Sequence, residues 1–329
     1  MSSDEPALRR FFNSLGFDGQ ASVCFKREPD FFLGRNLLGE RAETLVCRHG
    51  NDIVGMISHA YKKIFINGSP KTVYYLSDMR IVPSYRHKGP AKLLLETIRP
   101  QAEAMPTLFT IISDNVQGNL LTRRHAHVRR IGNYHSLLVA PWRRKKTTAA
   151  CGQDEDWEEI KSCISRNAVR YNFYPDELYG MRPKDFLVVR QAGKIVGVTA
   201  IWDQQGFKQT YATGYRGRTK LMKTAYDIVA KTMGFAPLPD PGKPYKYFFL
   251  GLTAIDEDDK SVFKDLMNAA SNQVFAKGYG FFMVGLTHNS PFLADARKYL
   301  HFSYDSEIYA MGPSLELDDR PLYLEIGAL

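Results

Sequence analysis

The sequence predicts an α/β (α+β) fold made of two tandem mixed-sheet units with flanking helices, in which the second copy is degenerate. Three observations lead to this prediction. Short apolar segments of strand length alternate with segments whose apolar residues recur at helical spacing. The order of these segments repeats in the second half of the chain. The length of 329 residues suits two domains of moderate size better than one.

The first unit is expected to start with a helix and to continue as a hairpin, a third strand, a second helix and further strands. The turn at 50–52 joins two strands into the hairpin, and the turn at 67–70 leads into the third strand. The expected elements are a helix over 7–17, strands over 44–49, 53–66 and 71–82, a helix over 90–104, a strand over 107–113, a short basic helix over 119–128 and a strand over 134–139.

The second unit follows a linker at 141–156 and repeats this order. Its strand–turn–strand segment at 186–202 copies the arrangement of the first hairpin. The expected elements are helices over 157–167, 218–233, 260–275 and 292–300 and strands over 186–190, 195–202, 245–255, 279–286 and 304–311. Segment 206–242 has no counterpart in the first half and is interpreted as an insertion. The predicted domains are residues 1–148 and residues 149–329.

Charge is unevenly distributed between the two halves. Residues 1–150 hold 23 Lys and Arg against 12 Asp and Glu, whereas residues 151–329 hold 21 against 23. The first half is therefore expected to bind an anionic ligand, for which a polyphosphate cofactor and nucleic acid both qualify. A solvated basic surface is the alternative interpretation.

The spacing of the cysteines and the hydropathy of the chain indicate the cellular compartment of the protein. The 4 cysteines are scattered without a CxxC pair, so neither a disulfide framework nor a zinc site is indicated. No apolar run has the length of a membrane span, and residues 1–6 lack the pattern of a secretory signal. We expect a reduced, cytoplasmic protein with no membrane partner and no metal.

Segment 76–95 (LSDMRIVPSYRHKGPAKLLL) contains the motif from which a chemistry is inferred. An apolar strand ends before Pro83, which cannot donate a ladder hydrogen bond. A basic turn with Arg86 and Lys88 follows, and a helix begins at Pro90, a residue that suits the first helical turn. Free N–H groups and the helix dipole hold anions at such a position, and Gly89 lets a phosphate approach the backbone closely. The arrangement fits a diphosphate.

This motif resembles the one that marks the GNAT superfamily of acyl-CoA-dependent N-acyltransferases. The family pattern is V-x-P-x-x-R-x-x-G-x-G/A between a strand and a helix, and this chain has IVPSYRHKGPA from Ile81 to Ala91. The departure is Pro90, which removes one N–H group from the phosphate cradle. The resemblance covers residues 40–140 and extends more weakly to the second half through the repeat.

The resemblance implies acetyl-CoA as co-substrate. In the family, the motif strand is splayed from the next strand, and the pantetheine arm bonds to exposed backbone groups in the gap. By position, the strand across the gap is 107–113. The residues that the resemblance assigns to the cofactor are Met79, Ile81, Val82, Arg86, His87, Lys88, Gly89, Pro90, Ala91 and Asn115. For Asn115, an ordinary turn residue is the alternative.

Acylation of an amine requires a proton acceptor, and the departing thiolate requires a proton donor. Asp78 lies where the family often places an acidic residue and is the candidate base, with an ordinary exposed strand carboxylate as the alternative. Thr122 stands where the family has a tyrosine donor. Tyr134 is the candidate replacement, with His125, His127 or solvent as alternatives. Some tandem relatives use the carboxylate of the last residue, which is Leu329 here.

The second unit lacks the cofactor motif. Its corresponding segment, 255–260 (IDEDDK), carries four consecutive acids that favour the N-terminus of their own helix and repel a diphosphate. This half is expected to complete the sheet and to form a wall of the substrate cleft.

The function predicted from the sequence is acetyl transfer to a primary amine on a small molecule or a peptide, by direct attack on the thioester. An aminoacyl-tRNA-dependent transferase is an alternative because the first half is basic, but the intact diphosphate motif favours coenzyme A over nucleic acid. A non-catalytic acyl-CoA-binding protein is the third hypothesis, since the family tyrosine is missing. The sequence defines neither the acceptor nor the oligomeric state.

Overall fold

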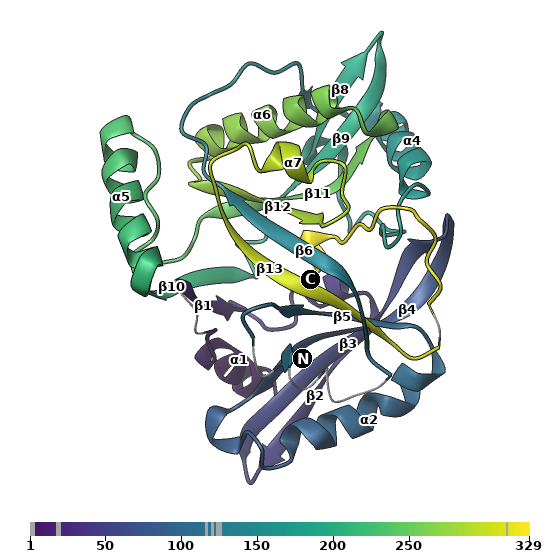
Figure 1. The fold of residues 1–329 in the computed structure, drawn as a ribbon, viewed down its shortest axis with the longest axis vertical. Helices are drawn as coiled ribbons and strands as arrows, with labels where there is room; N and C mark the ends of the chain where they lie inside the picture. Colours follow the sequence, from purple (N-terminus) through teal and green to yellow (C-terminus); the bar gives the residue numbers. More distant parts are fainter. Residues whose placement is uncertain (1–3, 18–20, 116–117, 120–121, 123–126, 314) are drawn as a thin grey trace.

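The structure is a computed structural model that describes residues 4–17, 21–115, 118–119, 122, 127–313 and 315–329. Most strands of this part of the chain form one mixed sheet of eleven, in the order β2-β3-β4-β5-β13-β6-β12-β11-β9-β8-β7, and helices cover both of its faces (Figure 1). The predicted α/β class with two mixed-sheet halves is confirmed.

The first half of the chain supplies two described helices and six strands. Their bounds are α1 Glu5–Ser14, β1 Ala21–Lys26, β2 Glu40–His49, β3 Asp52–Ile66, β4 Ser69–Ile81, α2 Pro90–Ala104, β5 Thr107–Ile112 and β6 Arg129–Val139. Helix α2 begins and ends at the predicted residues. It begins at Pro90 because proline suits the first helical turn and because Gly89 before it adopts φ +102°. The predicted basic helix over 119–128 falls mostly outside the described residues.

The second half supplies the other described elements. Their bounds are β7 Ala150–Cys151, α4 Trp157–Ala168, β8 Phe186–Gln191, β9 Lys194–Trp202, β10 Gln209–Tyr215, α5 Gly217–Met233, β11 Tyr247–Ile255, α6 Lys260–Lys277, β12 Phe281–Thr287, α7 Leu293–Ala296 and β13 His301–Met311. The predicted helix over 292–300 is confined to α7, because the chain turns at 297–300 to enter β13.

The two halves repeat one pattern of strand pairing. Antiparallel pairs β2–β3 and β3–β4 lead to the parallel pair β4–β5, and antiparallel pairs β8–β9 and β9–β11 lead to the parallel pair β11–β12. Helix α2 packs on the first half through Leu94, Ile98 and Ala102. Helices α4 and α6 pack on opposite faces of the second half. This symmetry agrees with the repeat seen in the sequence.

The halves interlock at the centre of the sheet. Strand β13 lies between β5 and β6, and β6 in turn pairs with β12 of the second half. The last strand of each half is thereby built into the other half. Strand pairing therefore crosses the predicted boundary between residues 148 and 149, and the two-domain division stays a prediction.

The predicted insertion lies outside the large sheet. Strand β10 pairs with β1, a strand that was not predicted, in a separate two-stranded sheet, and α5 follows it. Helix α5 projects from the side of the molecule, and Ala230 is its one buried residue (Figure 1).

Candidate active site

Strands β4 and β5 separate near the middle of the sheet. They pair in parallel only from Tyr74–Thr107 to Leu76–Phe109, although β4 continues to Ile81 and β5 to Ile112. Beyond Leu76 the edge of β4 therefore faces a gap. The sequence-based expectation of a splayed strand pair agrees with this register.

A bulge in β4 opens the gap. In the β3–β4 register, Met56 pairs with Arg80 and Ser58 with Ser77, so two residues of β4 stand opposite Ile57 alone. One of them is Asp78, whose φ of +52° is left-handed. Asp tolerates this region better than most residues do. The bulge changes the direction of the β4 backbone at the start of the gap.

The turn after β4 leaves N–H groups free at the start of α2. His87 and Gly89 have φ of +63° and +102°, and only glycine adopts the latter without strain. Among the described residues, none accepts a hydrogen bond from the N–H of His87, Gly89, Ala91 or Lys92. These donors and the helix dipole suit a phosphate.

Positive charge surrounds this turn. Arg86 and Lys88 are exposed, and the Lys88 ammonium lies 5.6 Å from the centre of the Tyr85 ring. The Tyr85 hydroxyl contacts His49 Nδ1 at 3.0 Å and so ties the turn to the end of β2. The turn is held in place by contacts that leave both cations available to a ligand.

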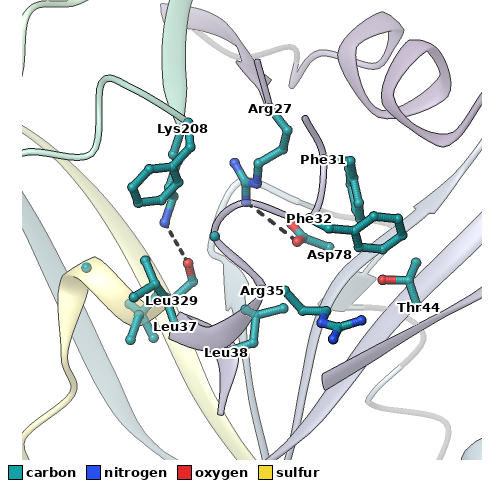
Figure 2. A pocket seen from close by; sticks show the side chains of 14 residues that line it. Arg27, Phe31, Phe32, Arg35, Leu37, Leu38, Thr44, Asp78, Lys208 and Leu329 are labelled. Atoms are coloured by element: carbon teal, nitrogen blue, oxygen red, sulfur yellow. Dashed lines mark hydrogen bonds and ion pairs between the residues drawn. The ribbon is translucent and has the colours of Figure 1, made fainter. Parts of the chain in front are cut away.

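The first cavity, which we call the Asp78 pocket, has a volume of about 450 Å³. Asp78 and Arg27 face each other in it at 3.6 Å, and Lys208 Nζ donates to the backbone oxygen of Leu329 at 2.8 Å (Figure 2). The pocket is lined by Arg27, Phe31, Phe32, Gly34, Arg35, Leu37, Leu38, Thr44, Asp78, Phe207, Lys208, Gly327, Ala328 and Leu329.

The second cavity, which we call the apolar pocket, also has a volume of about 450 Å³. It lies where β4 and β5 part, on the sheet face opposite α2. It is lined by Lys62, Ile64, Val73, Tyr75, Leu108, Phe109, Thr110, Phe173, Pro175, Tyr179, Ile308, Leu324, Glu325 and Leu329. Most of these side chains are aliphatic or aromatic, so the pocket fits an apolar group.

The segment 322–329, which we call the tail, lies between the two pockets. Leu329 lines both of them. Gln204 Nε2 donates to the Gly327 oxygen at 2.8 Å, and the Glu325 carboxylate accepts from Leu252 N at 2.7 Å. Lys62 Nζ donates to the Ala328 oxygen at 2.5 Å. Contacts from both halves of the chain therefore fix the tail in the core.

The pKa values of two lysines in this region are lowered, which favours the neutral amine. Burial lowers the pKa of Lys62 to about 7, and the acids Glu177 and Glu325 oppose this shift. Burial also lowers the pKa of Lys208, and Arg27 adds to this effect. Burial raises the pKa of Glu325 in the same region. The two lysines therefore change charge near neutral pH, Lys208 beside the Asp78 pocket and Lys62 beside the apolar pocket.

The residues predicted for the cofactor follow β4 and the turn in order. The side chains of Met79 and Ile81 pack against the α2 cluster, so they bring their backbone rather than their side chains to the gap. Asn115 Oδ1 accepts from Gly118 N at 3.0 Å. That bond is typical of a turn residue, the alternative considered for Asn115.

The predicted proton donors lie away from the pockets. Tyr134 is fully buried, its hydroxyl donates to the Leu324 oxygen at 3.0 Å, and it lines neither cavity. Burial raises its pKa well above the usual range. His127 is exposed, and His125 lies outside the described residues. The geometry thus assigns Tyr134 a structural contact with the tail.

A tyrosine that sequence analysis missed lies beside Thr122. The hydroxyl of Tyr309 on β13 bonds to the Glu307 carboxylate and lies 3.2 Å from Asn119 Oδ1, and its ring stacks on Phe109 with ring centres 5.4 Å apart. Burial raises its pKa, and a hydrogen bond to Thr122 opposes that shift. No local signal marks this residue, because it comes from the other half of the chain.

The acids at 256–259 form ion pairs with nearby arginines or cap helix α6. Asp256 pairs with Arg166 at 2.7 Å, and Asp258 pairs with Arg170 at 2.6 Å. Asp259 caps α6 by accepting from Ser261 N at 2.7 Å. This agrees with the expectation that the second half carries no diphosphate site of the same type.

Comparisons with known proteins agree with this geometry. Residues 7–126 match the sequence model of the acetyltransferase (GNAT) family. This part of the chain therefore carries a domain of the GNAT acetyltransferase family. No curated protein sequence matches it.

Solved structures with similar folds cover most of the chain. Saccharomyces cerevisiae N-myristoyltransferase with bound myristoyl-CoA is similar with a TM-score of 0.60 at 12% identity, over 97% of this chain and 82% of that one. A GCN5-related N-acetyltransferase from Sphaerobacter thermophilus has a TM-score of 0.54 at 10% identity, over 84% of this chain and 82% of that one. At such low identity, the likeness concerns the fold.

The described residues lack two features that mark other classes of protein. No described helix combines the length and the apolar character needed to cross a bilayer. Nowhere in the described ranges do three or more His, Cys, Asp or Glu side chains come together as metal ligands would.

We expect Lys62→Met to remove part of the pH dependence of stability. The unfolded chain keeps Lys62 protonated up to its ordinary pKa of 10.5, whereas the folded chain releases that proton above about 7. Between these values the unfolded state binds more protons, so the free energy of unfolding rises with pH, by at most roughly 1.4 kcal/mol per unit. Urea unfolding at about pH 7 and about pH 9 measures this slope.

The exposed Lys71 provides the matched control, since Lys71→Met leaves the buried ammonium in place. Its slope should equal that of the unmodified chain. Equal slopes for all three proteins would show that Lys62 is not shifted in the folded state.

Proposed function

We propose that the protein transfers an acetyl group from acetyl-CoA to a primary amine. The observation that carries this proposal is the gap between β4 and β5, followed at once by a turn with free N–H groups. The diphosphate of the cofactor binds at Gly89 and Ala91, with Arg86 and Lys88 as its cationic partners. The pantetheine arm lies along the β4 edge from Met79 to Val82.

The thioester then lies at the bulge, beside both pockets. The amine nitrogen attacks the acyl carbon, a C–N bond forms, and the C–S bond breaks. Backbone N–H groups at the bulge stabilise the oxyanion, Asp78 accepts the proton of the amine, and solvent protonates the thiolate. Tyr134 has no part in proton transfer in this scheme, because its hydroxyl is held by the tail.

The Asp78 pocket is the proposed acceptor site. It combines one carboxylate with Arg27 and Lys208, so it suits an amine on a small molecule or a peptide that also carries an anionic or carbonyl group. Residues 1–148 then hold the donor, and residues 149–329 supply Lys208 and the tail to the acceptor side. Leu329 of the tail lines the same pocket.

A longer acyl donor is the second candidate function. The apolar pocket opens where β4 and β5 part and is lined mainly by aliphatic and aromatic side chains. The similar yeast N-myristoyltransferase structure holds myristoyl-CoA. Both observations favour a donor whose hydrocarbon chain enters this pocket.

Reversing the charge of the turn tests the cofactor site. The double variant Arg86→Glu/Lys88→Glu should weaken acetyl-CoA binding at least about tenfold, because a hydrogen bond to a charged group contributes roughly 1.5–3 kcal/mol. Isothermal titration measures the affinity. The double variant Arg99→Glu/Lys277→Glu makes the same charge change at exposed positions away from the turn. Unchanged affinity in the first variant, or equal loss in both, contradicts the assignment.

Asp78→Asn tests the base. Asn also tolerates the left-handed backbone at this position, so the bulge is retained. We expect kcat to fall by about 10²–10⁴ while the affinity for acyl-CoA is unchanged, because only proton removal is lost. Release of free thiol over a panel of amines measures turnover. Arg27→Met breaks the ion pair but keeps the carboxylate, so an equal loss in that variant would assign the effect to the pair.

Thr110→Phe tests the length of the donor. Thr110 lines the apolar pocket and is half-buried, so a phenyl ring there fills the cavity. If the pocket holds the hydrocarbon of a long donor, kcat/KM for long acyl-CoAs should fall about tenfold or more while that for acetyl-CoA is kept. Thr110→Val is the matched control. An enzyme that uses acetyl-CoA alone, with no activity towards longer donors, excludes the second candidate.

A further inference from the structure

Helix α5 carries a group of exposed apolar side chains. Five large ones lie on this single helix, with exposed fractions of 49–73%: Leu221, Met222, Ile228, Val229 and Met233. At the angular spacing of an α-helix they fall within an arc of about 140°. Isolated exposed apolar residues need no explanation, but a contiguous stripe marks an interaction surface. We call these five residues the α5 stripe.

The other side of α5 is fixed to the protein. The Tyr226 ring packs edge-on against Phe302 of β13, with centres 5.1 Å apart, and its hydroxyl donates to the Ala236 oxygen at 2.9 Å. Lys223 Nζ bonds to Asp227 at 2.6 Å and to Asp240 at 3.0 Å. These contacts fix one side of a helix that projects from the body of the molecule (Figure 1), while the side chains of the α5 stripe remain exposed.

The charge of the helix selects an anionic partner. Segment 216–233 contains five basic residues, Arg216, Arg218, Lys220, Lys223 and Lys231, and one acid, Asp227. That acid is paired with Lys223. A second copy of the chain would bring two helices of the same positive charge together, and the single acid of each, Asp227, is already paired with Lys223 of its own helix.

The shape of the free surface favours a flat partner. A groove that enclosed the helix would need the side that Tyr226 already occupies. A planar surface needs only the exposed arc. Apolar residues flanked by Lys and Arg on one helix are the pattern of helices that lie in the interface of an anionic bilayer.

We propose that α5 docks the protein on the surface of an anionic phospholipid bilayer. The α5 stripe enters the boundary between headgroups and acyl chains, and Arg218, Lys220 and Lys231 contact lipid phosphates. The surface lies outside residues 7–126 and does not depend on the proposed acyl transfer. The expectation of no membrane partner rested on the lack of a spanning segment and of a secretory signal, and neither observation concerns a helix that lies on a bilayer surface.

Cosedimentation with vesicles tests this proposal. The full chain should bind vesicles of equimolar phosphatidylcholine and phosphatidylserine at least about tenfold more tightly than vesicles of phosphatidylcholine alone. The triple variant Leu221→Gln/Ile228→Gln/Val229→Gln should lose binding to the anionic vesicles by about tenfold or more, because it removes the apolar contact. The double variant Lys220→Glu/Lys231→Glu should lose it as well. All five positions are exposed, so folding is retained, which circular dichroism checks.

Matched changes elsewhere separate the helix from the rest of the surface. Val169→Gln and Lys277→Glu alter exposed residues outside α5 and should bind anionic vesicles like the unmodified chain. Absence of vesicle binding, equal binding to both vesicle types, or unaltered binding by the α5 variants overturns the proposal. So does light scattering that shows a dimer of the full chain and a monomer of the triple variant, because the α5 stripe would then bind a second copy.

Discussion

The short parallel contact between β4 and β5 is the constraint on which the rest of the site depends. The two strands share only three register pairs before they part, and the bulge at Asp78 lies just beyond the last pair. A longer ladder would satisfy the β4 edge and leave no backbone groups for a ligand. Strand β4 ends at the turn before α2. The gap along β4 is therefore followed directly by the free N–H groups of the turn and by the positive end of the α2 dipole.

The exchange of strands at the centre keeps that gap open. Strand β5 has β13, a strand of the other half, as its second neighbour, and β6 crosses to pair with β12. The chain after β13 returns through the core as the tail, which Lys62, Gln204 and Glu325 hold between the pockets. The second half, which lacks the cofactor motif, thus supplies the tail that lies between the two pockets.

Burial of charge gives this region its dependence on pH. Lys62, Lys208 and Glu325 lie near one another around the tail, and burial shifts each of them towards its neutral form. The cost of burying an ion is reduced when the group is neutral or hydrogen-bonded, and each of the three has a backbone partner. Helix α5 is the opposite case, since Arg218, Lys220, Lys231 and the α5 stripe are exposed to solvent.

Local chemistry in the sequence determined the repeated order of elements, the start of α2 and the cationic turn, because Gly89, Pro90 and the strand periodicity act over a few residues. The sequence also placed Asp78 on the motif strand. Tertiary structure alone decided which of the candidate residues meet. It buried Tyr134 against the tail, brought Tyr309 beside Thr122, paired β13 with β5 and set Lys208 opposite Asp78. These contacts join residues far apart in the chain, and strand exchange between two similar halves leaves no local pattern that would reveal them.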